Sequence, residues 1–307
     1  MFRKLTAMAA VLAMALVLTS SVFAGEKVAI GVLMKTMSDT YSNKLGEAIK
    51  DYSRKTYPDV ELLLVDAQAD IGKQISQAED LIAKRVGVVI LNAQDAEGSA
   101  QVLYLCEEAG IPVVEVNTQT IDDNYTAYVG SHDVEAGEIM GNHALKLLGG
   151  KGKVVILEGN MGQSPQLLRK QGLDNTILAA PGIELLAILT ADWARDKAMA
   201  ITEDWLGKYP QIDAILCEND DMAMGALQAV ESSGRTGVVI IGVDAIPDAL
   251  DAVAAGRMTA SVLQDAFNQA KTVVDVAYKV AKGEKVEKDY KVPFQLITKE
   301  NVKDFIE

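Results

Sequence analysis

The sequence predicts an α/β fold of two similar lobes, each built around a doubly wound parallel sheet. Short runs rich in Val, Ile and Leu alternate with longer stretches of helical period, which is the pattern of buried parallel strands joined by crossover helices. Almost every apolar run ends in a polar residue that can hydrogen-bond a hydroxyl group. Because the ligand crevice of such a sheet lies at the carboxyl ends of its strands, we expect these residues to meet in one cleft.

The first 24 residues have the features of a cleaved secretory signal peptide. Arg3 and Lys4 precede an apolar stretch at Ala7–Leu18, and a small-residue cleavage pattern ends at Ala24. The apolar stretch is too short to span a bilayer comfortably. We therefore predict an exported protein that is cleaved near Ala24, where Gly25 and not a lipid-anchored cysteine follows.

The first half of the remaining chain follows the order β-α-β-α-β. A helical stretch with Ala78 and Leu81 on its apolar face lies between two of the predicted strands. The predicted strands of this half are Val28–Met34, Glu61–Val65, Val86–Leu91 and Val113–Val116, and three of them lead into Lys35, Asn92 and Asn117.

The second half repeats this order. Its predicted strands are Val154–Leu157, Leu185–Leu189, Ala214–Cys217, Val238–Val243 and Thr259–Leu263, and they lead into segments that contain Glu158, Trp193, Asn219, Asp244 and Gln264. Gly110 and Gly234 take equivalent places in the two halves, where each closes a helix before a strand. A last helical stretch, Lys271–Lys282, follows both repeats and would complete the half that is one helix short.

The composition disfavours a nucleic-acid-binding protein and a fold that is stabilised by a disulfide. The chain after residue 24 has 27 basic and 43 acidic residues, a formal net charge of −16, and such a chain repels the phosphate backbone of nucleic acids. Cys106 and Cys217 lie in different halves, so we expect two free thiols rather than a disulfide. A core of this size does not depend on a covalent crosslink.

The motifs of several enzyme classes are missing. The glycine-rich segment at 149–152 precedes a strand instead of following one, and Gly159–Gly162 lacks both a third glycine and a phosphate-binding lysine. His132 and His143 have no metal-ligand spacing, so no metal or other cofactor is expected. Carboxylates are numerous, and spacing alone leaves open a secreted carbohydrate-active enzyme with a catalytic carboxylate pair.

The residues at the strand ends suit a ligand that carries several hydroxyl groups. Asp and Asn exchange hydrogen bonds with hydroxyls, while Tyr41 and Trp193 offer flat faces for the C–H surface of a sugar ring. Each has a structural alternative. The two aromatic residues could be ordinary core residues, and Asn219 and Asp244 could cap the helices that begin near Met222 and Pro247.

Several motifs, in this order, resemble those of the periplasmic sugar-binding proteins of the ribose/galactose type. They are Ile30-Gly31-Val32, the Asn-Asp-Asp-Met-Ala-Met-Gly-Ala string at Asn219–Ala226, the Ile-Gly-Val-Asp string at Ile241–Asp244, and Gly256–Val262 followed by Gln264. The resemblance runs from about Lys27 to the C-terminus. It implies a type I periplasmic binding fold, in which two doubly wound lobes are joined by a three-stranded hinge and close over one sugar. Transcription regulators of this fold begin with a DNA-binding helix pair, where this chain has a signal segment.

The resemblance also implies a set of ligand-binding residues. Asn219, Asp244 and Gln264 match the family's sugar-binding asparagine, aspartate and glutamine, and Arg169 matches the arginine of its Arg-x-x-Gly segment. Tyr41 and Trp193 match aromatic positions. The predicted ligand-binding residues are Lys35, Tyr41, Asn117, Arg169, Trp193, Asn219, Asp244 and Gln264.

Three departures argue against ribose as the ligand. Asn117-Thr118 replaces the Asp-Arg pair of ribose binders, Val243 replaces an aromatic residue, and Lys35 replaces a small polar residue. The segments Gly162–Ser164, Thr190–Arg195 and Gln264–Ala266 are similar to the subgroup that binds inositol and related cyclic polyols. For Lys35 three roles stay open: it bonds a hydroxyl, pairs with an acidic ligand, or contacts a neighbouring carboxylate.

The family resemblance implies the substrate-binding component of a carbohydrate ABC importer in the periplasm. We expect it to bind a monosaccharide or a cyclic polyol, with an inositol-like ligand favoured, and to present the closed form to a membrane permease. A sugar receptor that signals to a chemoreceptor would need the same pocket. We expect a monomer, with residues 25–128 plus 264–292 in the N-terminal lobe and residues 129–263 plus 293–307 in the C-terminal lobe.

Overall fold

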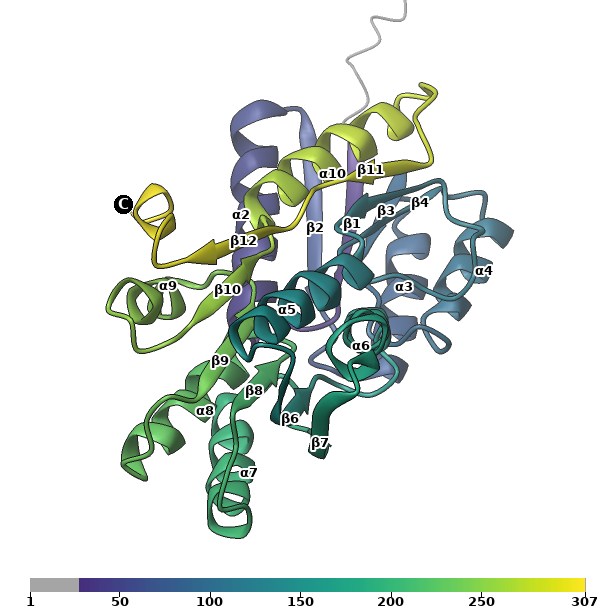
Figure 1. Ribbon diagram of the computed structural model, residues 1–307. Coiled ribbons are helices and arrows are strands. Elements are labelled where there is room, and N and C mark those ends of the chain that lie inside the picture. Colours follow the sequence, from purple (N-terminus) through teal and green to yellow (C-terminus); the bar gives the residue numbers. More distant parts are fainter. Residues whose placement is uncertain (1–27, 307) are drawn as a thin grey trace, which may run out of the picture.

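The computed structural model describes residues 28–306, so the predicted signal peptide lies outside the described residues. In this part of the chain the strands form two six-stranded sheets, one in each lobe (Figure 1). The strand order is β11-β5-β4-β3-β1-β2 in the N-terminal lobe and β12-β10-β9-β8-β6-β7 in the C-terminal lobe. The two orders are equivalent, which confirms the prediction of two similar doubly wound lobes.

The N-terminal lobe contains the first five strands and one strand from the end of the chain. Its strands are β1 Val28–Met34, β2 Val60–Asp66, β3 Val88–Leu91, β4 Val113–Val116, β5 Ala127–Gly130 and β11 Asp289–Lys291. Its helices are α2 Thr40–Thr56, α3 Ile71–Ala83, α4 Ala100–Glu108 and α10 Ala266–Ala281. All neighbouring strands of this sheet are parallel, as expected for buried strands joined by helices.

The C-terminal lobe repeats this plan. Its strands are β6 Lys151–Glu158, β7 Gly182–Thr190, β8 Ala214–Cys217, β9 Val239–Val243, β10 Ala260–Leu263 and β12 Gln295–Thr298. Its helices are α5 Asp133–Leu147, α6 Ser164–Asn175, α7 Arg195–Lys208, α8 Asp220–Ser232 and α9 Pro247–Ala254, with short 3-10 helices at Ile177–Ala179 and Val302–Asp304. The edge strand β12 pairs antiparallel with β10, and the other neighbours are parallel.

The last long helix belongs to the N-terminal lobe. Figure 1 shows α10 beside α2, and Ala270, Val273 and Val274 pack into the same core as Leu45 and Ile49. A separate core covers the opposite face of this sheet, under α3 and α4. The helix predicted at the end of the second repeat therefore completes the first lobe.

The chain passes between the lobes three times. The passages are the segments 131–132, 264–265 and 292–294, which lie between β5 and α5, β10 and α10, and β11 and β12. Gln264, a predicted ligand-binding residue, therefore stands within a hinge crossing. Within residues 28–306, every helix falls short of the length and apolarity that a membrane crossing requires.

Candidate functional site

A small pocket lies between the two lobes. Its lining consists of Lys35, Asp39, Tyr41, Ser42, Asn117, Pro165, Arg169, Trp193, Asn219, Asp244 and Gln264. All eight residues predicted from the sequence are among them. Apart from Pro165, the lining consists of polar and aromatic side chains, which can hydrogen-bond hydroxyl groups and pack against a ring.

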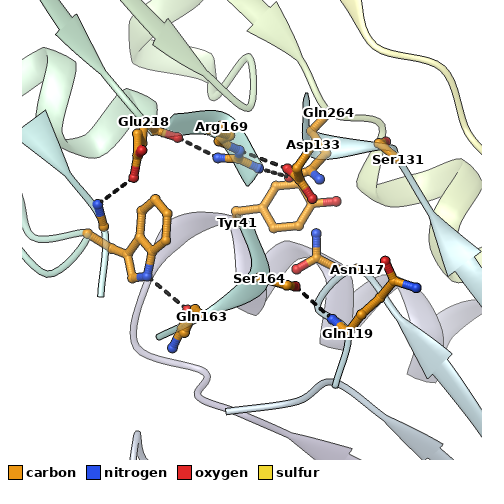
Figure 2. Close-up of polar contacts among 12 residues, drawn as sticks. Tyr41, Asn117, Gln119, Ser131, Asp133, Gln163, Ser164, Arg169, Glu218 and Gln264 are labelled. Atoms are coloured by element: carbon orange, nitrogen blue, oxygen red, sulfur yellow. Dashed lines mark hydrogen bonds and ion pairs between the residues drawn. The ribbon is translucent and has the colours of Figure 1, made fainter. Parts of the chain in front are cut away.

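Arg169 occupies one side of the pocket and is held by three protein groups. Figure 2 shows its guanidinium among Asp133, Glu218 and Gln264. Nε donates to Oδ1 of Asp133 at 2.8 Å, Nη1 donates to the carbonyl of Glu218, and Nη2 donates to Oε1 of Gln264 at 3.1 Å. The Asp133–Arg169 ion pair is almost fully buried, with 2% and 3% of the side chains exposed. This network fixes the planar fork and leaves two of its five N–H donors for other partners.

Two polar groups of the pocket have no partner in the described part of the chain. Nε2 of Gln264 is buried and donates to nothing, although its Oε1 is bonded to Arg169. The Asp244 carboxylate, with 6% of the residue exposed, accepts no hydrogen bond from residues 28–306. Burial raises the pKa of this carboxyl well above its usual value, and the positive charge of Arg169 opposes the effect only in part. Buried polar groups of this kind need a donor or acceptor from outside the protein.

The two asparagines are placed by their local structure. Asn219 is the N-cap of α8, because its Oδ1 accepts from the amide of Met222 at 2.9 Å. Its Nδ2 donates to the carbonyl of Trp193 at 3.3 Å, so one N–H remains. The capping role predicted for Asn219 is thus confirmed, and it coexists with a place in the pocket. Asn117 is anchored by Asn92, whose Nδ2 donates to its Oδ1 at 3.4 Å.

Three of the eight residues have a left-handed backbone conformation. The φ angles are +63° at Asn117, +64° at Trp193 and +119° at Asp244. Such values are uncommon for residues other than glycine and concentrate at functional sites. Asp244 does not take its alternative role as a helix cap, because the N-cap residue of α9 is Ile246 and no side chain caps this helix. The amide of Ile246 instead donates to Oδ2 of Asp220 at 3.0 Å.

Tyr41 and Trp193 present their rings to the pocket and have their polar atoms bonded elsewhere. The Tyr41 hydroxyl donates to Oε1 of Gln269 on α10 at 3.0 Å. Nε1 of Trp193 donates to Oε1 of Gln163 at 2.9 Å, and the cationic groups of Lys35 and Arg169 lie 5.6 Å and 5.7 Å from the centroid of its ring. Both aromatic rings are therefore fixed in orientation and available for packing against a ring-shaped ligand.

The indole of Trp193 lies directly over Gly159, which leads to a first prediction. A methyl group at this glycine would overlap the indole carbons, so the Gly159→Ala substitution should push Trp193 from its place. We expect at least a tenfold loss of affinity for the pocket's ligand, measured by calorimetry, from about 1.4 kcal/mol of lost ring packing.

Gly207→Ala is the matched control for this substitution. Gly207 lies in α7, and a methyl group there would meet no atom within 4 Å. Alanine should therefore leave binding unchanged and stabilise the helix by about 0.5–1 kcal/mol. Equal affinity of the Gly159→Ala variant and the parent protein would show that the position of Trp193 does not matter for binding.

Lys35 does not contact a neighbouring carboxylate, which had been one of its three possible roles. In the described residues no carboxylate oxygen lies within ion-pair distance, and Nζ donates instead to Oε1 of Gln163 at 3.0 Å. Burial lowers the pKa of this ammonium group, and the negative charge of Asp39 opposes the shift. Its remaining donors are free for a ligand.

The lobes are in direct contact around the pocket, so the structure is a closed form. The amide of Ala96 donates to the carbonyl of Gly162 at 3.0 Å, and the amide of Thr40 donates to Oδ2 of Asp221 at 3.4 Å. These bonds join the N-terminal lobe to the C-terminal lobe.

Three residues important for the site were not among the sequence-based predictions. Asp133 pairs with Arg169, Gln163 bonds to both Lys35 and Trp193, and Glu218 is buried behind Arg169 with Oε2 accepting from the amide of Gly159 at 2.8 Å. Burial raises the pKa of the Glu218 carboxyl well above its usual value. Two of them had a signal in the sequence: Glu218 directly follows an apolar run, and Gln163 lies in the segment that is similar to the inositol-binding subgroup.

Comparison with known proteins agrees with this geometry. The sequence pattern of the "Periplasmic binding protein domain" family matches residues 30–285. A xylitol-binding protein of Mycolicibacterium smegmatis is 35% identical over 91% of this chain and 79% of its own length. A ribose import binding protein of Salmonella typhimurium is 29% identical over 94% of this chain and 96% of its own length.

The fold is similar to that of a solute-binding protein of known structure. An ABC transporter solute-binding protein of Bacillus halodurans with bound myo-inositol superposes with a TM-score of 0.88 at 34% identity, over 91% of this chain and 97% of that protein. The relatives are binding proteins, as the sequence predicted, and not enzymes. The chain belongs to the periplasmic binding protein family.

Proposed function

We propose that this protein is the substrate-binding component of a carbohydrate ABC importer and captures one monosaccharide or cyclic polyol by closing its lobes. The pocket carries this proposal. Both lobes contribute polar groups to it, and Asp244 and Nε2 of Gln264 have no partner within residues 28–306. A hydroxyl group both donates and accepts, so a polyol supplies the partners that these groups need.

The balance of charge in the pocket favours an uncharged ligand. Among the residues that line the pocket, the positive charges of Lys35 and Arg169 are matched by the negative charges of Asp39 and Asp244, when all four are ionised. An inositol-like ligand is favoured among polyols because the relative from Bacillus halodurans carries myo-inositol. The relatives named for xylitol and ribose bind the same class of molecule, which supports a polyol more broadly.

The two lobes should close around the ligand because each lobe carries some of the residues that we assign to ligand binding. Lys35, Tyr41 and Asn117 belong to the N-terminal lobe, while Arg169 and Asp244 belong to the C-terminal lobe. A ligand that contacts both sets binds the closed form more tightly than the open form and shifts the population toward it. The closed protein in the periplasm would then be the species that the membrane permease recognises, and a chemoreceptor would read the same closed shape.

A thermal-shift panel tests the function. We expect myo-inositol or a closely related polyol to stabilise the protein by about 2.7 kcal/mol at 100 times its dissociation constant. The panel should contain myo-inositol, xylitol, ribose and a sugar acid, with an amino acid and a nucleotide as controls. Stabilisation by the amino acid or the nucleotide, with no response to any polyol, would contradict the proposal.

A further inference from the structure

Three consecutive residues of the C-terminal lobe each bond to the N-terminal lobe. We call this stretch, Gly162-Gln163-Ser164, the interlobe segment. The carbonyl of Gly162 accepts from the amide of Ala96 at 3.0 Å. Oγ of Ser164 accepts from the amide of Gln119 at 2.8 Å (Figure 2). Between them, Oε1 of Gln163 accepts from Nζ of Lys35 at 3.0 Å. The segment is therefore a continuous contact that exists only while the lobes are closed.

The backbone of this segment is built for a close approach. Gly162 has a φ of +88°, and a methyl group in its place would lie 2.6 Å from Oδ2 of Asp95 in the other lobe. Only glycine meets both conditions. Gln163 is the N-cap residue of α6, yet its side chain makes no capping bond, so the carboxamide turns toward the pocket instead.

Gln163 joins the lobe contact to the pocket. Its Oε1 accepts from Lys35 of one lobe and from Nε1 of Trp193, at 2.9 Å, of the other lobe. A carboxamide oxygen has two lone pairs, so these two bonds use its full capacity. Only 2% of Gln163 is exposed, which keeps water from replacing either donor. One buried atom thus fixes a pocket group from each lobe.

We propose that Gln163 is a positioning residue that makes lobe closure and assembly of the pocket a single event. This inference rests on the proposed function, because the two groups that Gln163 places are groups we assign to ligand binding. In an open form the Lys35 bond is lost, and the indole of Trp193 and the ammonium of Lys35 no longer share a partner. A neutral oxygen has a further consequence: it holds Lys35 weakly enough that closure still requires the ligand, whereas a carboxylate would form a charged pair with it.

The Gln163→Glu substitution tests this in the absence of any ligand. The new carboxylate should pair with Lys35 across the closed interface and raise the ratio of closed to open protein about tenfold. Distances between spin labels on the two lobes, or small-angle scattering, measure this ratio. In the Lys35→Met background the same substitution should have no such effect. An unchanged ratio in Gln163→Glu, or an increase that persists without Lys35, would overturn the proposal.

Gln163→Ala tests the placement of Trp193. With myo-inositol as the probe, we expect about a tenfold loss of affinity, corresponding to one lost buried hydrogen bond to each placed group. In a Trp205→Phe background, where Trp193 is the remaining tryptophan, its emission should also change. Leu167→Ala is the control, since Leu167 is exposed on the same helix and should alter neither readout.

These two experiments separate the inference from the function. If no polyol binds the parent protein, the proposed function is wrong, while the ligand-free closure measurement still reports on Gln163. If myo-inositol binds the Gln163→Ala variant as well as the parent, with unchanged emission, Gln163 has no positioning role. A melting temperature near that of the parent shows that each variant is folded.

Discussion

Replacing Arg169 with Met should destabilise the protein by about 3–5 kcal/mol and abolish measurable ligand binding. The loss of stability has a specific cause, because Asp133 is 2% exposed and would keep a buried negative charge without its cation. The loss of binding has a different cause, because the substitution removes the free N–H groups of the guanidinium from the pocket. Urea unfolding measures the first effect and calorimetry the second.

The double variant Arg169→Met with Asp133→Asn separates the two effects. Without the unpaired charge, much of the stability should return, whereas binding should remain lost. Lys170→Met is the matched single control. Lys170 follows Arg169 on α6 and forms an i,i+4 ion pair with Asp174, whose side chain is half exposed, so its loss should change stability by about 0.5 kcal/mol or less. A stable Arg169→Met protein would contradict the role of this buried pair.

Asp244→Asn should have opposite effects on binding and on stability. The carboxylate accepts no bond within residues 28–306, so removing its charge relieves a desolvation cost, and the ligand-free protein should unfold at the same or a higher temperature. Affinity should fall about 10–100-fold, because a charge-assisted bond to a ligand hydroxyl is worth about 1.5–3 kcal/mol. Asp220→Asn is the control: this neighbouring carboxylate accepts from Ser261 and Ile246, so its loss should lower stability.

The Asp244 carboxylate should make ligand affinity depend on pH. Burial raises the pKa of Asp244 in the ligand-free protein, and hydroxyl donors from a ligand favour the ionised form. Binding therefore lowers this pKa and releases protons, so affinity should increase with pH until the ligand-free carboxyl is fully ionised. Below that pH, the affinity should fall by up to about tenfold per pH unit. Calorimetry between pH 5 and 8 should show this slope in the parent protein and a smaller one in Asp244→Asn.

Most of the pocket residues could be predicted because they follow strands that are recognised from short apolar runs in the sequence. Lys35, Asn117 and Asp244 each come directly after a buried run of Val, Ile, Leu or similar residues, and Asn219 comes one residue later than such a run. Parallel strands point their carboxyl ends to one edge of the sheet, so sequence position alone places these side chains at the cleft. Asn92 and Glu158 follow strands in the same way but do not line the pocket. Asn92 turns into the N-terminal lobe, where it bonds to Lys35 and Thr118.

Three short strands at or next to a sheet edge were missed, and the partner of Arg169 was missed with them. β5, β11 and β12 have three or four residues each, and β11 reads Asp-Tyr-Lys, which has no apolar run. These strands form through pairing with a neighbour rather than through their own pattern. Asp133 follows β5, so the strand-end argument could not find it.

The two repeated lobes, the strand ends and the chemical types of side chain that gather there were all predictable from local sequence patterns. These properties arise from residues close together in the chain, since hydrophobic period and turn residues act over a few positions. Tertiary structure alone decided which of the gathered groups are already bonded and which are free. Arg169 and Gln163 take partners 30 to 128 residues away, while Asp244 takes none from the described chain. Such pairings depend on how elements distant in the sequence pack together and, for Lys35, on how the closed lobes meet, and no local pattern records them.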